Sequence, residues 1–205
     1  MLTKARLFGC FWSCNPAGRG IGVSEELLVQ HCSPTLAGMK TGNLFSWTFS
    51  SKEELRTCIR CWNQLLGGKG LRVLPLRIQG NRALIYVYRP TRLSKDLQQD
   101  DASKLLEQRG YCPENATCCI ARLMKILRQN QEFPHEIGLF LGYPPEDVSG
   151  FIEHGASGCK SVGCWKVYGD TATAEKTFAK FKKCTAIYCS QFAKGKSIER
   201  LTVAG

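Results

Sequence analysis

Apolar and polar positions follow two different periods along the chain, and these predict helices and strands in turn. An apolar stripe at helical spacing predicts a helix over residues 51–66. Two runs rich in apolar and aromatic residues, 71–78 and 83–88, predict strands joined by a hairpin at 79–82. Pro75 places the first strand at a sheet edge or a bulge, because proline cannot donate a hydrogen bond to a neighbouring strand.

The other segments predict more helices and two more strands. Helices are expected at 24–31, 90–98, 102–108 and 115–128, from 144 onward, and at 173–193; strands are expected at 137–141 and 164–168. The run at 137–141 is short and apolar, so it is predicted as a central, buried strand. Together these elements predict an α+β fold, a small, mainly antiparallel sheet with helices packed on it, of which a papain-like arrangement is one form.

Domain organisation follows from a cap and a breaker-rich stretch near the start. Ser24 with the acidic residues after it is typical of a helix start, whereas residues 15–22 are rich in glycine and proline-type breakers. We therefore expect a disordered tail over residues 1–23 and a single domain over residues 24–205. No stretch is long and apolar enough to span a membrane, and no secretion signal is evident, so a cytoplasmic location is expected.

Charge and cysteine content widen the choice of chemistry. The chain of 205 residues has 28 Lys and Arg against 17 Asp and Glu, a formal net charge of +11, which favours an anionic partner but also simply aids solubility. In an intracellular chain of this length, 12 cysteines are more often reduced, metal-bound, catalytic or small core residues than disulfide-bonded.

Four segments are similar to an uncharacterised family of proteins from anaerobic Firmicutes. They are His31-Cys-Ser-Pro-Thr-Leu-Ala-Gly38, Ala83-Leu-Ile-Tyr-Val-Tyr-Arg89, Phe133-Pro-His-Glu-Ile-Gly-Leu-Phe-Leu-Gly-Tyr-Pro-Pro-Glu-Asp-Val-Ser-Gly-Phe-Ile152 and Gly163-Cys-Trp-Lys-Val-Tyr-Gly-Asp170. The resemblance runs from about residue 24 to residue 189. It implies no particular activity, so function has to be argued from the residues.

Cys32 and His135 form the first candidate site, a thiol nucleophile with its base. Papain-like hydrolases and bacterial cell-wall endopeptidases have a Cys at a helix start and a His at a strand start, in this order. Here Cys32 follows the predicted helix, and no Asp or Asn in the sequence is marked as the group that orients the His. The alternative is a buried Cys and a His at a strand end.

Cys159, Cys164, Cys184 and Cys189 form the second candidate, a site for zinc or an iron–sulfur cluster. Cys184 and Cys189 lie on one predicted helix and diverge by about 140° around it, which opposes a shared metal. Cys58 and Cys61 resemble a redox pair, but both lie inside a predicted helix, where filling the core is the better interpretation.

The predicted C-terminal helix is the third candidate, as a surface for nucleic acid or another anion. Its lysines alternate with aromatic residues, which also describes an amphipathic helix with solvated lysines. The leading hypothesis is a Cys32/His135 thiol hydrolase acting on an acyl or amide bond. The alternatives are a metal- or redox-linked accessory protein that uses the clustered cysteines, and an anion- or nucleic-acid-binding module.

Overall fold

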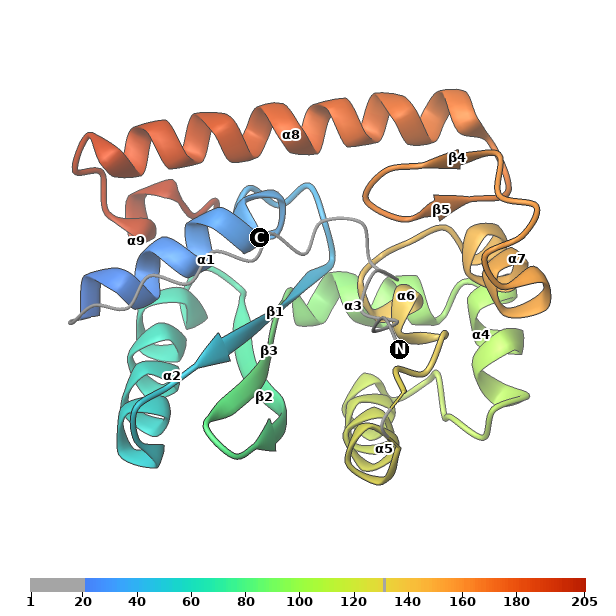
Figure 1. The fold of residues 1–205 in the computed structure, drawn as a ribbon, viewed down its shortest axis with the longest axis horizontal. Coiled ribbons are helices and arrows are strands. Elements are labelled where there is room, and N and C mark those ends of the chain that lie inside the picture. The colour runs from blue at the N-terminus through green and yellow to red at the C-terminus, as the bar shows by residue number, and fades with distance from the viewer. Residues whose placement is uncertain (1–20, 131) are drawn as a thin grey trace, which may run out of the picture.

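A three-stranded antiparallel sheet lies at the centre of the computed structural model, which describes residues 21–130 and 132–205 (Figure 1). The strand order is β1-β3-β2, with β1 at Gly42–Thr48, β2 at Arg72–Gln79 and β3 at Arg82–Tyr88. Side chains of the central strand alternate between two hydrophobic cores, as the pleat of a strand requires. Ile85 and Val87 enter one core, whereas Tyr86 and Tyr88 enter the other.

One face of the sheet is covered by α1 (Ile21–Leu36), α2 (Lys52–Gly67), α9 (Ile198–Leu201) and the C-terminal half of α8 (Thr171–Ala193). We call this hydrophobic cluster the α2-side core; its large, fully buried members include Leu28, Phe45 and Trp62. Ser51 caps α2 by accepting a hydrogen bond from the Glu54 amide at 3.0 Å.

The opposite face is covered by five helices: α3 (Pro90–Leu97), α4 (Asp100–Glu107), α5 (Ala116–Gln129), α6 (Ile137–Phe140) and α7 (Pro145–His154). We call this cluster the α5-side core. Its centre includes Leu123 and Phe140, which have no exposed surface. The Tyr86 hydroxyl joins sheet to helix by donating to the Phe140 carbonyl at 2.5 Å.

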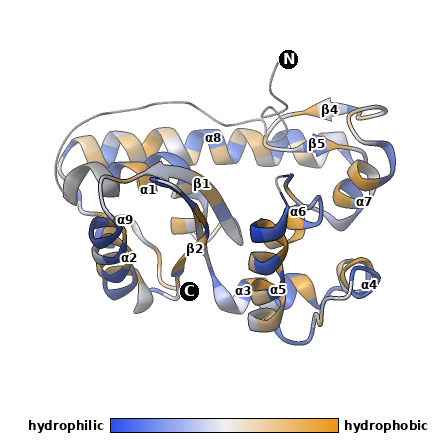
Figure 2. Cartoon of the chain, turned by 60° about the horizontal axis from the view of Figure 1, so that its bottom comes forward, coloured by the Kyte–Doolittle hydropathy of each residue, from blue (hydrophilic) through white to orange (hydrophobic). Residues whose placement is uncertain are grey.

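A third, smaller cluster lies under the N-terminal half of α8, which runs along one edge of the molecule (Figure 1). It holds Trp165, Val167, Ala174 and Phe181 around a short hairpin, β4 (Ser161–Val162) and β5 (Lys166–Val167). We call it the β5 cluster. Figure 2 shows hydrophobic and hydrophilic residues mixed along α8, as an amphipathic helix requires.

Most of the predicted elements are confirmed, and so is the α+β class with its small antiparallel sheet. The predicted helices at 51–66, 90–98, 102–108, 115–128 and 173–193 correspond to α2, α3, α4, α5 and α8 within two residues at each end. The hairpin is present, with Gly80 in its turn at a φ of 58°. Pro75 lies on the edge strand β2 next to a register shift, as predicted.

The predicted strand at 137–141 is wrong, because residues Ile137–Phe140 form the helix α6. All four residues are buried, so their apolar run carried no period that separates a buried strand from a buried helix. The predicted strand at 164–168 is reduced to Lys166–Val167.

The first helix was also placed wrongly, since α1 extends from Ile21 through Pro34 to Leu36. Cys32, Thr35 and Leu36 are fully buried, so tertiary packing sustains the helix past its proline. Residues 1–20 of the predicted tail lie outside the described residues. Among the described helices, none combines the length and the apolar character needed to cross a membrane.

Candidate functional site

A cleft of about 570 Å³ opens between the α5-side core and the β5 cluster. Its walls come from the loop after α1, from α3, from the α6–α7 turn, from Trp165 beside β5 and from the N-terminal half of α8. Three of the four segments that resemble the family contribute to these walls or adjoin them. The volume is within the range of about 300–1,000 Å³ that small-molecule sites occupy.

Three cations reach the cleft from three separate elements. Lys40, in the loop after α1, is only 6% exposed, and its ammonium lies 5.0 Å from the centre of the Tyr143 ring. Arg92 of α3 is exposed and donates to the Gly38 carbonyl at 2.5 Å. Lys180 of α8 is exposed at the opposite wall.

Four carboxylates also line the cleft, and three of them accept hydrogen bonds from the protein itself. Asp96 accepts from the Thr41 hydroxyl, and Asp170 caps α8 by accepting from the amide and the hydroxyl of Thr173. These Thr173 hydrogen bonds lower the pKa of Asp170. Glu146 is exposed, and no hydrogen bond engages it among the described residues.

Asp147 is the carboxylate that organises the wall. It is 3% exposed and accepts three hydrogen bonds: from the Trp165 indole at 2.7 Å, from the Tyr168 amide at 2.7 Å and from the Gly169 amide at 2.9 Å. It also lies in the first turn of α7, where the helix dipole favours a negative charge. The β5 segment is therefore attached to α7 through one buried side chain.

Two aromatic rings form an apolar surface within the cleft. Tyr143 and Trp165 stack with centroids 4.7 Å apart, and the Tyr143 hydroxyl donates to the Cys164 carbonyl at 3.2 Å. Phe178 packs edge-on against Trp165 from α8. The cleft thus offers cations, one available carboxylate and a flat apolar wall.

His135 lies beside this cleft, at a small cavity of about 30 Å³ that shares Tyr143, Asp147 and Trp165 with it. Its ring packs edge-on against Phe151, with centroids 4.8 Å apart. A cavity of this size holds about one water molecule. His135 therefore adjoins a candidate ligand site, although its partner there is an aromatic ring.

Cys32 lies elsewhere, fully buried in the α2-side core on the other face of the sheet. Burial raises the pKa of its thiol far above the usual range, and the nearby Lys40 cation offsets this only in part. No hydrogen bond or ring contact among the described residues joins Cys32 to His135. The structure therefore places Cys32 and His135 in different parts of the fold, and the burial of Cys32 favours its neutral thiol over the thiolate.

The four cysteines proposed for zinc or an iron–sulfur cluster are distributed over different parts of the fold. Cys164 packs against the β5 cluster, whereas Cys189 packs against the α2-side core. Cys184 is buried on α8, and Cys159 makes a weak 3.7 Å contact with the Ala156 carbonyl. Over residues 21–130 and 132–205, no three His, Cys, Asp or Glu side chains converge to hold a metal.

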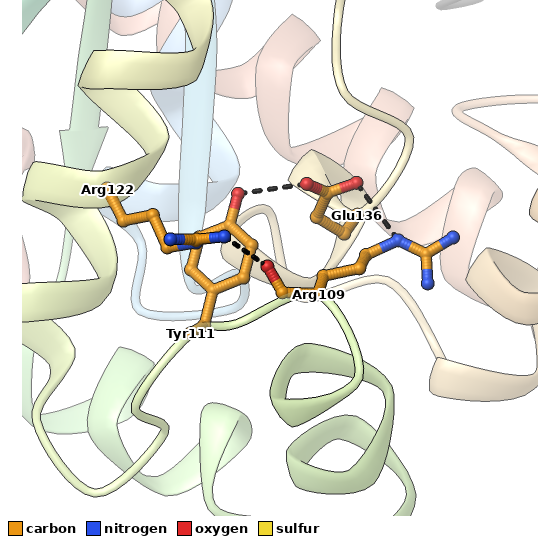
Figure 3. Close-up of polar contacts among 4 residues, drawn as sticks. All are labelled: Arg109, Tyr111, Arg122 and Glu136. Atoms are coloured by element: carbon orange, nitrogen blue, oxygen red, sulfur yellow. Dashed lines mark hydrogen bonds and ion pairs between the residues drawn. The ribbon is translucent and has the colours of Figure 1, made fainter.

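Glu136 is the other buried carboxylate within the segment 133–152, and Figure 3 shows the contacts that hold it. It accepts from the Tyr111 hydroxyl at 2.9 Å and pairs with Arg109 at 3.4 Å. Arg122 lies over the Tyr111 ring and donates to the Arg109 carbonyl at 2.6 Å. Burial and the Glu136 carboxylate raise the pKa of the Tyr111 hydroxyl. This network fastens the loop before α5 to the start of α6.

Lysines of the C-terminal helix lie on its solvent face. Lys176, Lys180 and Lys183 are exposed and share one side of α8, since residues three and four apart are neighbours on a helix. Phe181 faces inward to the β5 cluster. The amphipathic interpretation thus holds for the aromatic residues, while the lysines form a basic stripe.

Sequence reasoning missed the cleft, although one signal for it was present. Tyr143, Asp147 and Trp165 all lie in the segments that resemble the family, yet they were examined as separate patterns. In the sequence, Glu146 and Asp147 are adjacent acidic residues near the start of the helix predicted from 144 onward, where negative charge is common. Only the fold separates them, because it buries Asp147 and leaves Glu146 exposed.

Comparisons with known proteins give a family without an activity. No curated protein and no solved structure matches the chain. A family model described as a protein of unknown function, DUF3793, matches residues 28–202. Since this match takes in nearly all of the described fold, the chain belongs to the DUF3793 family.

Proposed function

We propose that the protein binds a small anionic molecule in the cleft between the α5-side core and the β5 cluster. The observation that carries the proposal is the convergence of Lys40, Arg92 and Lys180 on one cavity from three elements. Charge-assisted hydrogen bonds to such cations are stronger than neutral ones. A thiol hydrolase is not proposed, because Cys32 is buried on the other face of the sheet.

The carboxylates of the cleft are compatible with an anionic ligand. Asp96, Asp147 and Asp170 already accept hydrogen bonds from protein donors, which partly satisfies their oxygens. Glu146 is exposed and accepts no hydrogen bond among the described residues, so it is available for a donor group of the ligand. A molecule with an anionic group and a separate hydroxyl or amino group therefore fits this arrangement, with its flat or apolar part against Tyr143 and Trp165.

Thermal unfolding with added ligands tests the proposal. Inorganic phosphate, pyrophosphate, a nucleoside monophosphate and a hydroxy-dicarboxylate are titrated separately, and at least one should raise the melting temperature in a saturable way. Arg92→Ala and Lys180→Ala should each weaken that binding about ten- to hundredfold, since a charged hydrogen bond contributes roughly 1.5–3 kcal/mol.

Arg60→Ala is the matched control, because Arg60 is an exposed arginine of α2, outside the cleft. Its binding should equal that of the unaltered protein. If none of the four compounds binds, or if Arg60→Ala weakens binding as much as Arg92→Ala, the proposal is wrong.

The basic stripe on α8 supports a second candidate, a single-stranded nucleic acid. Lys176, Lys180 and Lys183 are exposed on one side of the helix and would contact successive phosphates. Binding of a labelled oligonucleotide should weaken in the double variant Lys176→Ala/Lys183→Ala and should fall steeply with salt. Arg92→Ala separates the two candidates, because it affects the cleft and leaves the stripe intact.

A further inference from the structure

Three cysteines gather at the start of α5, and none of them lines the cleft. Cys112 lies in the loop between α4 and α5, and Cys118 and Cys119 lie in the first turns of the helix. Cys112 and Cys118 are exposed, whereas Cys119 is buried. Exposed and buried thiols thus lie within one short stretch of chain, and none of the three cysteines lines the proposed binding site.

Hydrogen bonds fix the loop that brings the thiols together. The Cys119 thiol donates to the Cys112 carbonyl at 3.1 Å, and the Asn115 amide donates to the same carbonyl at 3.0 Å. The Asn115 side chain caps α5 by accepting from the Cys118 amide at 3.1 Å. Residues 112 and 119 are therefore held side by side although seven positions separate them.

The electrostatics of Cys119 agree with this proximity. Burial raises the pKa of its thiol, and the neighbouring Cys112 and Cys118 sulfurs raise it further, although the hydrogen bond to Cys112 lowers it. Cys119 is thus a protected thiol beside an accessible one. An accessible thiol that reacts first and a protected thiol that reacts second form the usual pair for disulfide exchange.

We propose that Cys112 and Cys119 form an intrachain disulfide by exchange with a low-molecular-weight disulfide such as oxidised glutathione. The Cys112 thiolate attacks the external disulfide, forms a mixed disulfide and releases one glutathione thiol. The Cys119 thiolate then attacks the Cys112 sulfur and releases the second glutathione. The protein loses two protons and two electrons, equivalent to two hydrogen atoms, and one molecule of oxidised glutathione becomes two molecules of the thiol.

The loop has a mechanical link to the rest of the fold. Tyr111, which precedes Cys112, donates to Glu136 next to α6, and Arg122 lies over its ring one turn after Cys119 (Figure 3). A disulfide at Cys112 would constrain the backbone next to Tyr111 and so affect the contacts of Tyr111 with Glu136 and Arg122. The site is therefore a redox-sensitive modification site attached to the α5-side core.

Peptide mapping tests the proposal on the full chain. Tryptic cleavage after Arg109 and Arg122 yields one peptide that carries all three cysteines. The protein is equilibrated with oxidised glutathione at about pH 8.5, where thiolates form, and is then unfolded in acid and alkylated. We expect the peptide to lack two hydrogens and to carry a single alkyl group, on Cys118.

Two exposed positions provide matched variants that preserve the fold. Cys118→Ser should keep the disulfide, whereas Cys112→Ser should lose it and leave Cys119 free. Three alkylated cysteines, a glutathione that stays attached to Cys112, or a disulfide that persists in Cys112→Ser would each overturn the proposal. Equal melting temperatures of the two reduced variants would show that the difference is not one of folding.

Discussion

The sheet and the wall of the cleft are stabilised in different ways. In β3 the side chains alternate between two apolar cores, and successive residues are buried from Ala83 to Tyr88. Between residues 132 and 170, in contrast, regular structure is limited to two helices and two strands of two residues each. There the chain is held by polar side chains that bond to the backbone, above all Asp147. Apolar periodicity therefore defines the scaffold, and single buried polar groups define the site.

The largest expected effect is on the scaffold. Phe140→Ala removes a fully buried ring from the α5-side core, where it packs against Tyr111. The free energy of unfolding should fall by about 3–5 kcal/mol, because the ring leaves a cavity that the core fills only in part. Urea unfolding measures this. A loss below about 1 kcal/mol would show that the α5-side core tolerates a cavity at position 140 and that this ring is not needed to stabilise the fold.

Asp147→Asn tests the polar side of the comparison. An amide oxygen can still accept from the Tyr168 and Gly169 amides, but the amide NH₂ then faces the Trp165 indole, which loses its acceptor. We expect the free energy of unfolding to fall by about 2–3 kcal/mol. The Trp165 indole N–H becomes a buried donor without an acceptor, and its hydrogen bond to a charged carboxylate is lost.

Trp165→Phe is the control for the hydrogen bond between Trp165 and Asp147. In this background the indole N–H is absent, so Asp147→Asn should cost clearly less than in the unaltered protein. An equal cost in both backgrounds would mean that the indole bond contributes nothing and that the backbone bonds alone hold the wall.

Cys32→Ala sharpens the comparison with a smaller effect. The thiol is fully buried in the α2-side core, so its removal should lower the free energy of unfolding by only about 1 kcal/mol. Ligand binding to the cleft should be unchanged. If the variant lost a measured activity but kept its stability, Cys32 would again be a candidate for a chemical role.

The smallest effect concerns pH. The Thr173 hydrogen bonds lower the pKa of Asp170 in the folded protein, so the carboxylate contributes stability above its unfolded pKa of about 4. That contribution is lost as the pH falls through the folded pKa. Melting temperatures between about pH 3 and pH 6 should therefore decline slightly less steeply for Asp170→Asn, which keeps a capping side chain. Identical pH profiles would contradict this role.

The fold was largely predictable where one face of an element is buried. The apolar stripe of α2 and the apolar run of β3 can both be recognised in the sequence, and both elements were predicted. Strand β1 was missed although Phe45, Trp47 and Phe49 alternate and are all buried. The run of α6 could not be resolved, because four consecutive buried residues have no period.

The candidate site was much less predictable, since its residues come from separate segments and contribute through burial. Lys40 and Asp147 are charged side chains that a sequence places on the surface by default. The fold buries both, and it places Cys32 in the α2-side core, whereas His135 lies beside Phe151 at the small cavity next to the cleft. Reactive residue types were thus found from composition, but their environments depend on contacts that no local pattern contains.

Arg89 bears on how the chain reaches this fold. Its buried guanidinium donates to the carbonyls of Thr35 and Leu36 at 2.8 and 2.9 Å, of Lys69 at 3.3 Å and of Val203 at 2.7 Å. Val203 lies 114 positions after Arg89, so this acceptor is synthesised long after the other three, which all precede Arg89 in the chain. The complete set of hydrogen bonds around the guanidinium can therefore form only after Val203 has been synthesised, and it joins the end of β3 to three parts of the chain that are distant in sequence.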